Sequence, residues 1–166
     1  MDFREGMAAS REFNLRLGLF YGAWTSADMT IDLAIGRFLG LSDYEAQILT
    51  SGMEFGPKAR LLYEVVKRSV HPKKTKILRS LNKLRNEAKR NILAHSYLIA
   101  DRESVTFLER SRGGDYIVKK HRFTYLQWQK DVTETLQAGE EFWKALGYTR
   151  EELVTFAQAA LGMAKN

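Results

Sequence analysis

The residues with the clearest chemical potential lie together at positions 90–95, where the chain reads Arg-Asn-Ile-Leu-Ala-His. Arginine neutralises phosphate charge, and histidine exchanges protons near neutral pH. An arginine and a histidine that meet at one site can therefore bind and cleave a phosphodiester without a metal ion. The motif follows a strongly basic stretch of chain, which favours a polyanion as the ligand.

Helix geometry constrains how these side chains can act. On a regular helix Asn91 and His95 share one face, because residues four apart lie about one turn apart. Arg90 and His95 point about 140° away from each other around the same helix. The alternative to a catalytic role is structural. His95 then packs on the apolar stripe and interacts with the helix C-terminal dipole, while Arg90 is a solvated charge.

Positive charge is concentrated around the motif. The chain has a formal net charge of +6, but residues 57–95 alone hold twelve Lys and Arg residues against two acids. This clustering favours a polyanionic partner such as RNA. A solvated basic face that binds nothing is the alternative. The candidate RNA-binding residues are Lys73, Lys74, Lys76, Arg79, Lys83, Arg85 and Lys89.

Composition limits the classes of protein that fit. With 166 residues, 45% of them hydrophobic, the chain can bury a core, and we expect a single domain over 1–166. The absence of cysteine excludes disulfides, zinc–cysteine sites and thiol catalysis. His71, His95 and His121 fall in different predicted elements without metal-ligand spacing. Neither a metal nor another cofactor is therefore expected.

The acidic residues on predicted helices have two interpretations. Asp28 and Asp32 lie four residues apart on one helix, where they either form a carboxylate site or act as surface charges and partners for basic residues. The second interpretation is favoured, because no Glu-x-x-His accompanies them. Glu140 and Glu141 are interpreted as acids on a helix surface. Charged residues also interrupt the apolar stretches, and the N-terminus does not resemble a signal peptide, so we expect a cytoplasmic protein without a membrane span.

Apolar residues recur with helical spacing over most of the chain. They predict a long helix over about residues 10–39, on which Gly18 and Gly22 mark the close approach of a neighbour. A short helix follows a capping box formed by Ser42 and Glu45. Pro57 fits the first position of the next helix.

The second half of the chain changes pattern. A basic helix is predicted over about residues 73–95, and two later helices are capped by residues 124–127 and 149–152. Between them, residues 97–123 predict a small antiparallel β-hairpin or meander. Aromatic residues near these strands either stack on unpaired bases or pack the sheet onto the helices, and packing is favoured; they are Tyr97, Phe107, Tyr116, Phe123 and Tyr125. The predicted fold class is all-α, an up-and-down helical bundle of about five to six helices with this β insertion.

The motif at 90–95 resembles the Arg, polar residue, three residues, His signature of the HEPN superfamily. Members of that superfamily are small all-α bundles, and many are metal-independent endoribonucleases of toxin–antitoxin and defence systems. The resemblance extends loosely over residues 10–100. It implies that His95 is the general base or acid on the ribose 2′-hydroxyl, that Arg90 neutralises the scissile phosphate, and that Asn91 orients His95 or the phosphate.

The resemblance also implies a homodimer, in which the two motifs face each other. This fits the 140° separation, because antiparallel copies can bring Arg90 of one chain toward His95 of the other. RNA is the implied substrate, and a cognate antitoxin or other protein is an implied partner. The alternative is a non-catalytic HEPN-like protein, a dimeric interaction or nucleic-acid-binding module whose motif is buried for stability.

Overall fold

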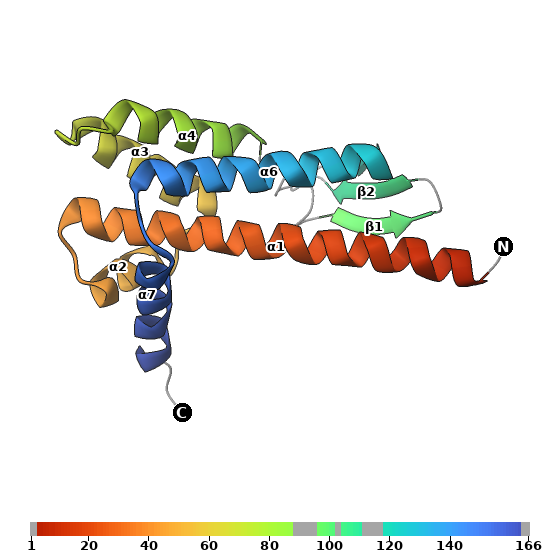
Figure 1. Cartoon of the computed structure of the whole chain (residues 1–166), viewed down its shortest axis with the longest axis horizontal. Helices are drawn as coiled ribbons and strands as arrows, with labels where there is room; N and C mark the ends of the chain where they lie inside the picture. The colour runs from red at the N-terminus through yellow and green to blue at the C-terminus, as the bar shows by residue number, and fades with distance from the viewer. Residues whose placement is uncertain (1–2, 88–95, 102–103, 111–117, 164–166) are drawn as a thin grey trace. The chain divides into compact units, whose positions relative to one another are not determined.

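The computed structural model describes residues 3–87, 96–101, 104–110 and 118–163. The fold is an all-α helical bundle with a small antiparallel sheet inserted between α4 and α6, as predicted (Figure 1). None of the helices in these ranges is long and apolar enough to cross a membrane. The elements are α1 (Phe3–Leu39), α2 (Asp43–Thr50), α3 (Phe55–Arg68), α4 (Lys74–Glu87), β1 (Ser96–Ala100), β2 (Ser104–Arg110), β3 (Val118–Thr124), α6 (Tyr125–Leu146) and α7 (Arg150–Met163).

Side chains cap the helices where the sequence predicted. The Ser42 hydroxyl accepts from the Glu45 backbone N–H at 3.3 Å, and the Glu45 carboxylate accepts from the Ser42 backbone N–H at 2.9 Å. Thr149 and Glu152 form the same reciprocal pair before α7, at 3.2 and 2.7 Å. Each pair satisfies backbone donors that the first helical turn leaves unpaired. These local signals therefore determine where α2 and α7 begin.

Two helix starts differ from the prediction, and the predicted end of the basic helix is not tested. α1 begins at Phe3 rather than near residue 10. α3 begins at Phe55, so Pro57 is its third residue and not its first. Proline is tolerated there because N–H groups of the first turn have no intrahelical acceptor. α4 is described as far as Glu87, and residues 88–95 of the predicted basic helix lie outside the described residues.

The chain divides into two compact units. The first comprises Met1–Gly22 and Glu87–Leu136, and the second comprises Ala23–Asn86 and Gln137–Asn166. The dividing points fall inside α1 and α6, so each of these helices contributes a segment to both units. The prediction that residues 1–166 form a single domain is not tested by this division.

The first unit contains the sheet and an aromatic core. Its strands pair antiparallel in the order β1-β2-β3, with Val105 opposite both Ala100 and Phe123. Trp128 of α6 is 2% exposed and lies within ring-packing distance of Phe107 and Phe123, at 5.5 and 6.4 Å between centroids. These two phenylalanines therefore pack the sheet against α6, the role that the sequence favoured for them. Tyr116 lies outside the described residues.

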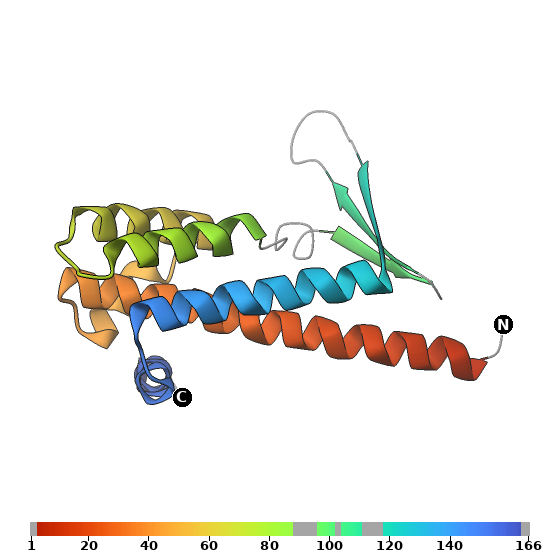
Figure 2. The same cartoon turned by 45° about the horizontal axis from the view of Figure 1, so that its top comes forward.

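The second unit is built from helices alone. In it α3 and α4 run side by side, next to the C-terminal segments of α1 and α6, in both views of the molecule (Figures 1 and 2). Aliphatic side chains fill its core, including Ile31, Leu62 and Leu81, each 0% exposed. Where α1 meets α2, a Cβ added at Gly36 would lie 2.7 Å from the Ala46 Cβ. Only glycine allows this close approach.

Gly18 and Gly22 do not behave as predicted. A Cβ added at either position would find no other atom within 4 Å among the described residues. Both residues are exposed on α1. The predicted close neighbour is therefore not supplied by the described part of this chain.

Candidate functional site

The predicted catalytic residues Arg90, Asn91 and His95 lie outside the described residues, as does Lys89. In the chain they come directly after α4 and directly before β1. The described part of the candidate site is therefore α4, together with the side chains that surround its basic residues.

α4 presents its basic residues away from the core. Ile77, Leu81 and Leu84 are at most 1% exposed and form the buried face of the helix. Spacings of three and four residues place apolar and basic side chains on different faces. The predicted RNA-binding residues in and before α4 are accordingly accessible: Lys73, Lys76, Arg79 and Arg85 are exposed, and Lys74 and Lys83 are half-buried.

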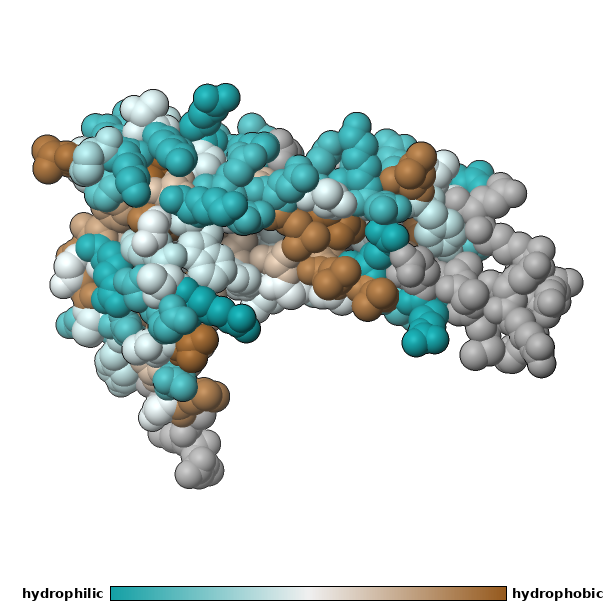
Figure 3. Space-filling view, viewed as in Figure 1, coloured by the Kyte–Doolittle hydropathy of each residue, from teal (hydrophilic) through white to brown (hydrophobic). Residues whose placement is uncertain are grey.

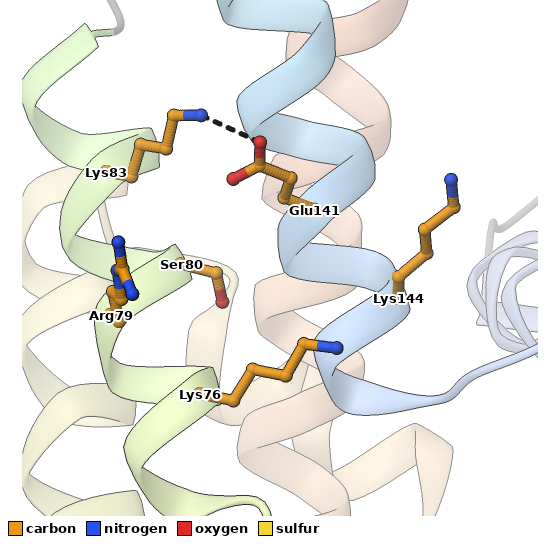
Figure 4. Close-up of a pocket in the computed structure, with 6 residues that line it drawn as sticks. All are labelled: Lys76, Arg79, Ser80, Lys83, Glu141 and Lys144. Carbon is orange, nitrogen blue, oxygen red and sulfur yellow. Dashed lines mark hydrogen bonds and ion pairs between the residues drawn. The ribbon is translucent and has the colours of Figure 1, made fainter.

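A groove in the second unit brings part of this basic face against α6. Its volume is about 530 Å³. The α4 residues on its wall follow the spacing i, i+3, i+4 and i+7, so they share one helix face. We call it the basic groove, and its lining residues are Lys76, Arg79, Ser80 and Lys83 of α4 with Glu141 and Lys144 of α6 (Figure 4).

The charges in the basic groove do not balance. Among the described residues, four cationic side chains line it against the one carboxylate of Glu141. Lys83 Nζ donates a hydrogen bond to Glu141 Oε1 at 2.8 Å, and the two side chains are 37% and 53% exposed. Ion pairs with this exposure are weak, because water screens them. The groove therefore retains a positive potential that suits an anionic ligand.

The surroundings of the groove are hydrophilic. The face over α4 and the C-terminal part of α6 is mostly teal in the space-filling view (Figure 3). In the close-up, Lys76 and Lys83 extend from α4 toward α6, and Ser80 lies between them (Figure 4). Ser80 is only 6% exposed, and its hydroxyl donates to the Ile77 carbonyl at 3.0 Å. It therefore forms part of the floor, and the cations form the rim.

Sequence reasoning identified only one wall of this groove. Glu141 was interpreted as a surface acid, and Lys144 was not singled out. Glu141 and Lys83 are 58 residues apart in the chain, and no local pattern connects them. The i, i+4 ion pair of Lys144 with Glu140, at 2.5 Å, is also typical of an ordinary solvated helix face. Only tertiary packing brings these residues beside α4.

A second cluster of charges lies in the interior of the same unit. Lys58 is 6% exposed, and its Nζ lies 3.0 Å from Asp28 Oδ2 and 2.8 Å from Asp32 Oδ2. Asp28 and Asp32 are thus partners for a basic residue, as the sequence favoured. Their other oxygens, Asp28 Oδ1 and Asp32 Oδ1, are buried and have no hydrogen-bond partner within the described ranges.

The cluster holds two carboxylates and one ammonium group, and burial and the contacts among them shift the pKa values of Asp32 and Lys58. Burial raises the pKa of Asp32, and the hydrogen bond and charge of Lys58 offset the shift only in part. Burial alone would lower the pKa of Lys58, but hydrogen bonds and charge from Asp32 and Asp28 outweigh it and raise this pKa too. Both shifts favour the protonated forms of these side chains.

The histidines inside the described ranges have structural partners. His121 Nε2 lies 2.9 Å from Glu109 Oε2 on the sheet, and the His71 ring packs edge-on against Phe38 at 5.4 Å. His71 Nδ1 also accepts from the Lys73 backbone N–H at 3.2 Å. Within those ranges, no group of three or more His, Cys, Asp and Glu side chains is close enough to hold a metal ion.

Comparison of the chain with protein-family models, curated proteins and solved structures found no match. The likeness to the HEPN superfamily consequently depends on the motif at 90–95 and the helices around it.

Proposed function

We propose that the chain is a metal-independent endoribonuclease resembling HEPN toxins and that Arg90, Asn91 and His95 are its catalytic residues. The observation that carries the proposal is the basic face of α4, which directly precedes these residues in the chain and lines a groove rich in cations. Such a face supplies the electrostatic attraction on which nucleic-acid binding depends. A phosphodiester held there would lie on the element that leads into the motif.

The proposed reaction is an internal transphosphorylation. The ribose 2′-oxygen forms a bond to phosphorus, the bond from phosphorus to the 5′-oxygen breaks, and the products are a cyclic phosphate and a 5′-hydroxyl. The proton leaves the 2′-hydroxyl for a base, and an acid returns a proton to the 5′-oxygen. His95 serves in this proton transfer, and Arg90 stabilises the charge on the phosphate. Asn91 orients His95 or the phosphate.

The proposal includes a homodimer. Arg90 and His95 of one helix would diverge by about 140°, so a second copy supplies the missing half of each site. A cognate antitoxin or another protein is a further proposed partner. A protein that stays strictly monomeric would contradict this part of the proposal.

The test compares purified wild type with His95→Ala on labelled structured RNA in EDTA, with light scattering to measure the molar mass. Cleavage by a dimeric wild type, and none by folded His95→Ala, is the expected result. His121→Ala is the matched control, because it removes a histidine whose partner is Glu109 on the sheet, and it should cleave normally. Activity that disappears in EDTA, or that survives in His95→Ala, would refute the proposal.

A second candidate is a nucleic-acid-binding module without catalytic activity. The observation that favours it is that six described residues outside the motif already form the basic groove. Binding would then not require Arg90 or His95. This candidate predicts salt-dependent RNA binding, no cleavage by wild type, and a loss of stability or of the dimer in His95→Ala.

A further inference from the structure

From the basic groove we infer that Glu141 limits the affinity of this protein for RNA, and that Lys144 of α6 joins Lys76, Arg79 and Lys83 of α4 in binding the RNA backbone. Neither α6 residue belongs to the sequence-derived set. The identity of the polyanion rests on the proposed function, whereas the groove and its charges do not.

The competition follows from the geometry at Lys83. Its Nζ donates to Glu141 Oε1 at 2.8 Å across the groove (Figure 4). A phosphate oxygen that binds Lys83 must displace this carboxylate or accept repulsion from it. Because both side chains are partly exposed, breaking this ion pair costs little free energy. Glu141 therefore weakens anion binding without preventing it.

On the α6 wall of the groove, Lys144 is likewise paired with a partly exposed carboxylate. It lines the groove, and its Nζ lies 2.5 Å from Glu140 Oε1 one turn earlier on α6. The Lys144 side chain is 69% exposed, so it can turn from Glu140 to a ligand at little energetic cost. A strand bound in the groove would thus contact cations from two helices that are distant in sequence.

The extent of the basic face favours a nucleic-acid strand over a free nucleotide. Lys76 and Lys83 are seven residues apart, or about 10 Å along the helix. A nucleic-acid strand repeats its phosphates at regular intervals, so successive phosphates can meet this row of cations. Exposed Lys73 and Arg85 lie beyond its two ends in the chain. A single nucleotide would leave most of these cations unused.

The test measures binding without cleavage. Wild-type protein is titrated into a fluorescently labelled single strand of about twelve 2′-O-methyl nucleotides, which lacks the free 2′-hydroxyl that the proposed reaction needs. Affinity is measured by fluorescence anisotropy at several salt concentrations in EDTA. Binding should weaken steeply with salt.

Two matched pairs of variants isolate the groove. Glu141→Gln should bind about two- to fivefold more tightly than wild type, whereas Glu134→Gln, which removes an α6 carboxylate paired with Lys130 at 3.7 Å, should bind as wild type does. Lys144→Gln should bind about three- to tenfold more weakly and reduce the salt slope by about 0.7. Lys130→Gln, which removes a lysine of similar exposure, should have little effect.

Several results would overturn the inference. Equal effects of Glu141→Gln and Glu134→Gln would show that only net charge matters. An unchanged affinity in Lys144→Gln would remove α6 from the site. If ATP displaced the strand at equimolar phosphate, the groove would be a pocket for small anions. If the wild-type protein did not bind the strand even at low salt, its partner would not be RNA. The 2′-O-methyl strand cannot be cleaved by the proposed reaction, so these binding results test the groove separately from the ribonuclease activity, which the His95→Ala experiment tests.

Discussion

The two compact units solve the problem of building a core in different ways. The first gathers aromatic rings around Trp128, which has ring contacts to Phe13, Phe20, Phe107 and Phe123 at 5.5–6.4 Å. The second packs mostly aliphatic residues between helices, together with buried aromatic residues such as Phe142, and encloses a salt bridge of Lys58 with two aspartates. One core is therefore centred on a cluster of rings around Trp128, and the other combines helix packing with a buried ion cluster.

The largest expected effect tests the aromatic core. Trp128→Ala should lower the free energy of unfolding by about 3–5 kcal/mol, because it leaves a cavity among the four rings. Urea denaturation followed by circular dichroism measures the loss. Hydrogen exchange should show that the amides of β2 lose protection before those of α3.

Trp128→Phe is the matched variant. It retains a ring, and it removes an indole Nε1–H that is buried without a partner among the described residues. Its loss should be about 1–2 kcal/mol. If Trp128→Ala and Trp128→Phe were equally destabilising, the cavity explanation would be wrong.

The next effect concerns the buried charges. Lys58→Met should reduce stability by about 2–4 kcal/mol, because it leaves two partly buried carboxylates without their cation. We place the value below that of a fully buried pair because the Asp28 side chain is 32% exposed. Lys67→Met on the same helix removes an exposed lysine and should change stability by less than about 0.5 kcal/mol. A comparable loss in both variants would mean that the salt bridge contributes nothing specific.

Two glycines of α1, one in each unit, allow the packing of the two units to be compared. Gly36→Ala should destabilise by about 1–3 kcal/mol, because the new Cβ would lie 2.7 Å from the Ala46 Cβ. Gly22→Ala should instead stabilise by about 0.5–1 kcal/mol, because alanine favours the helix and the space is open. Thermal unfolding of both variants gives the comparison. A destabilised Gly22→Ala, especially one with an altered molar mass, would reveal a neighbour from a second chain.

The smallest effect is a dependence on pH. Because the pKa of Asp32 in the fold is raised above 3.8, folding favours its protonated form. The stability that Asp32 adds relative to Asp32→Asn is therefore present at low pH and is lost as pH rises through the folded pKa. The unfolding free energies of the two proteins should therefore diverge as pH rises from about 4 to 7. A difference that changes in the opposite direction would show that Lys58 dominates the cluster.

Local signals predicted much of the secondary structure. The Ser42–Glu45 and Thr149–Glu152 pairs begin helices because each pair satisfies its own backbone donors within four residues. β-prone segments separated by turn residues likewise predicted the antiparallel sheet. The start of α3 was misjudged at Pro57, because proline is compatible with more than one position in a first turn.

The candidate site was predicted only in part. The basic face of α4 could be identified from composition and helical spacing, because all its residues belong to one segment. Glu141 and Lys144 could not, because their role depends on which helix lies beside α6. Arg90, Asn91 and His95 stay a prediction that the described residues do not test.

The sequence by itself determined the helical class, the capped helix starts, the inserted strands and the basic character of α4, because each depends on interactions among residues a few positions apart. Tertiary structure alone decided that Lys58 is buried between Asp28 and Asp32, and that Lys83 meets Glu141. Those contacts join residues 26, 30 and 58 positions apart. Their energies depend on burial and distance, which are properties of the packed helices and not of any single segment.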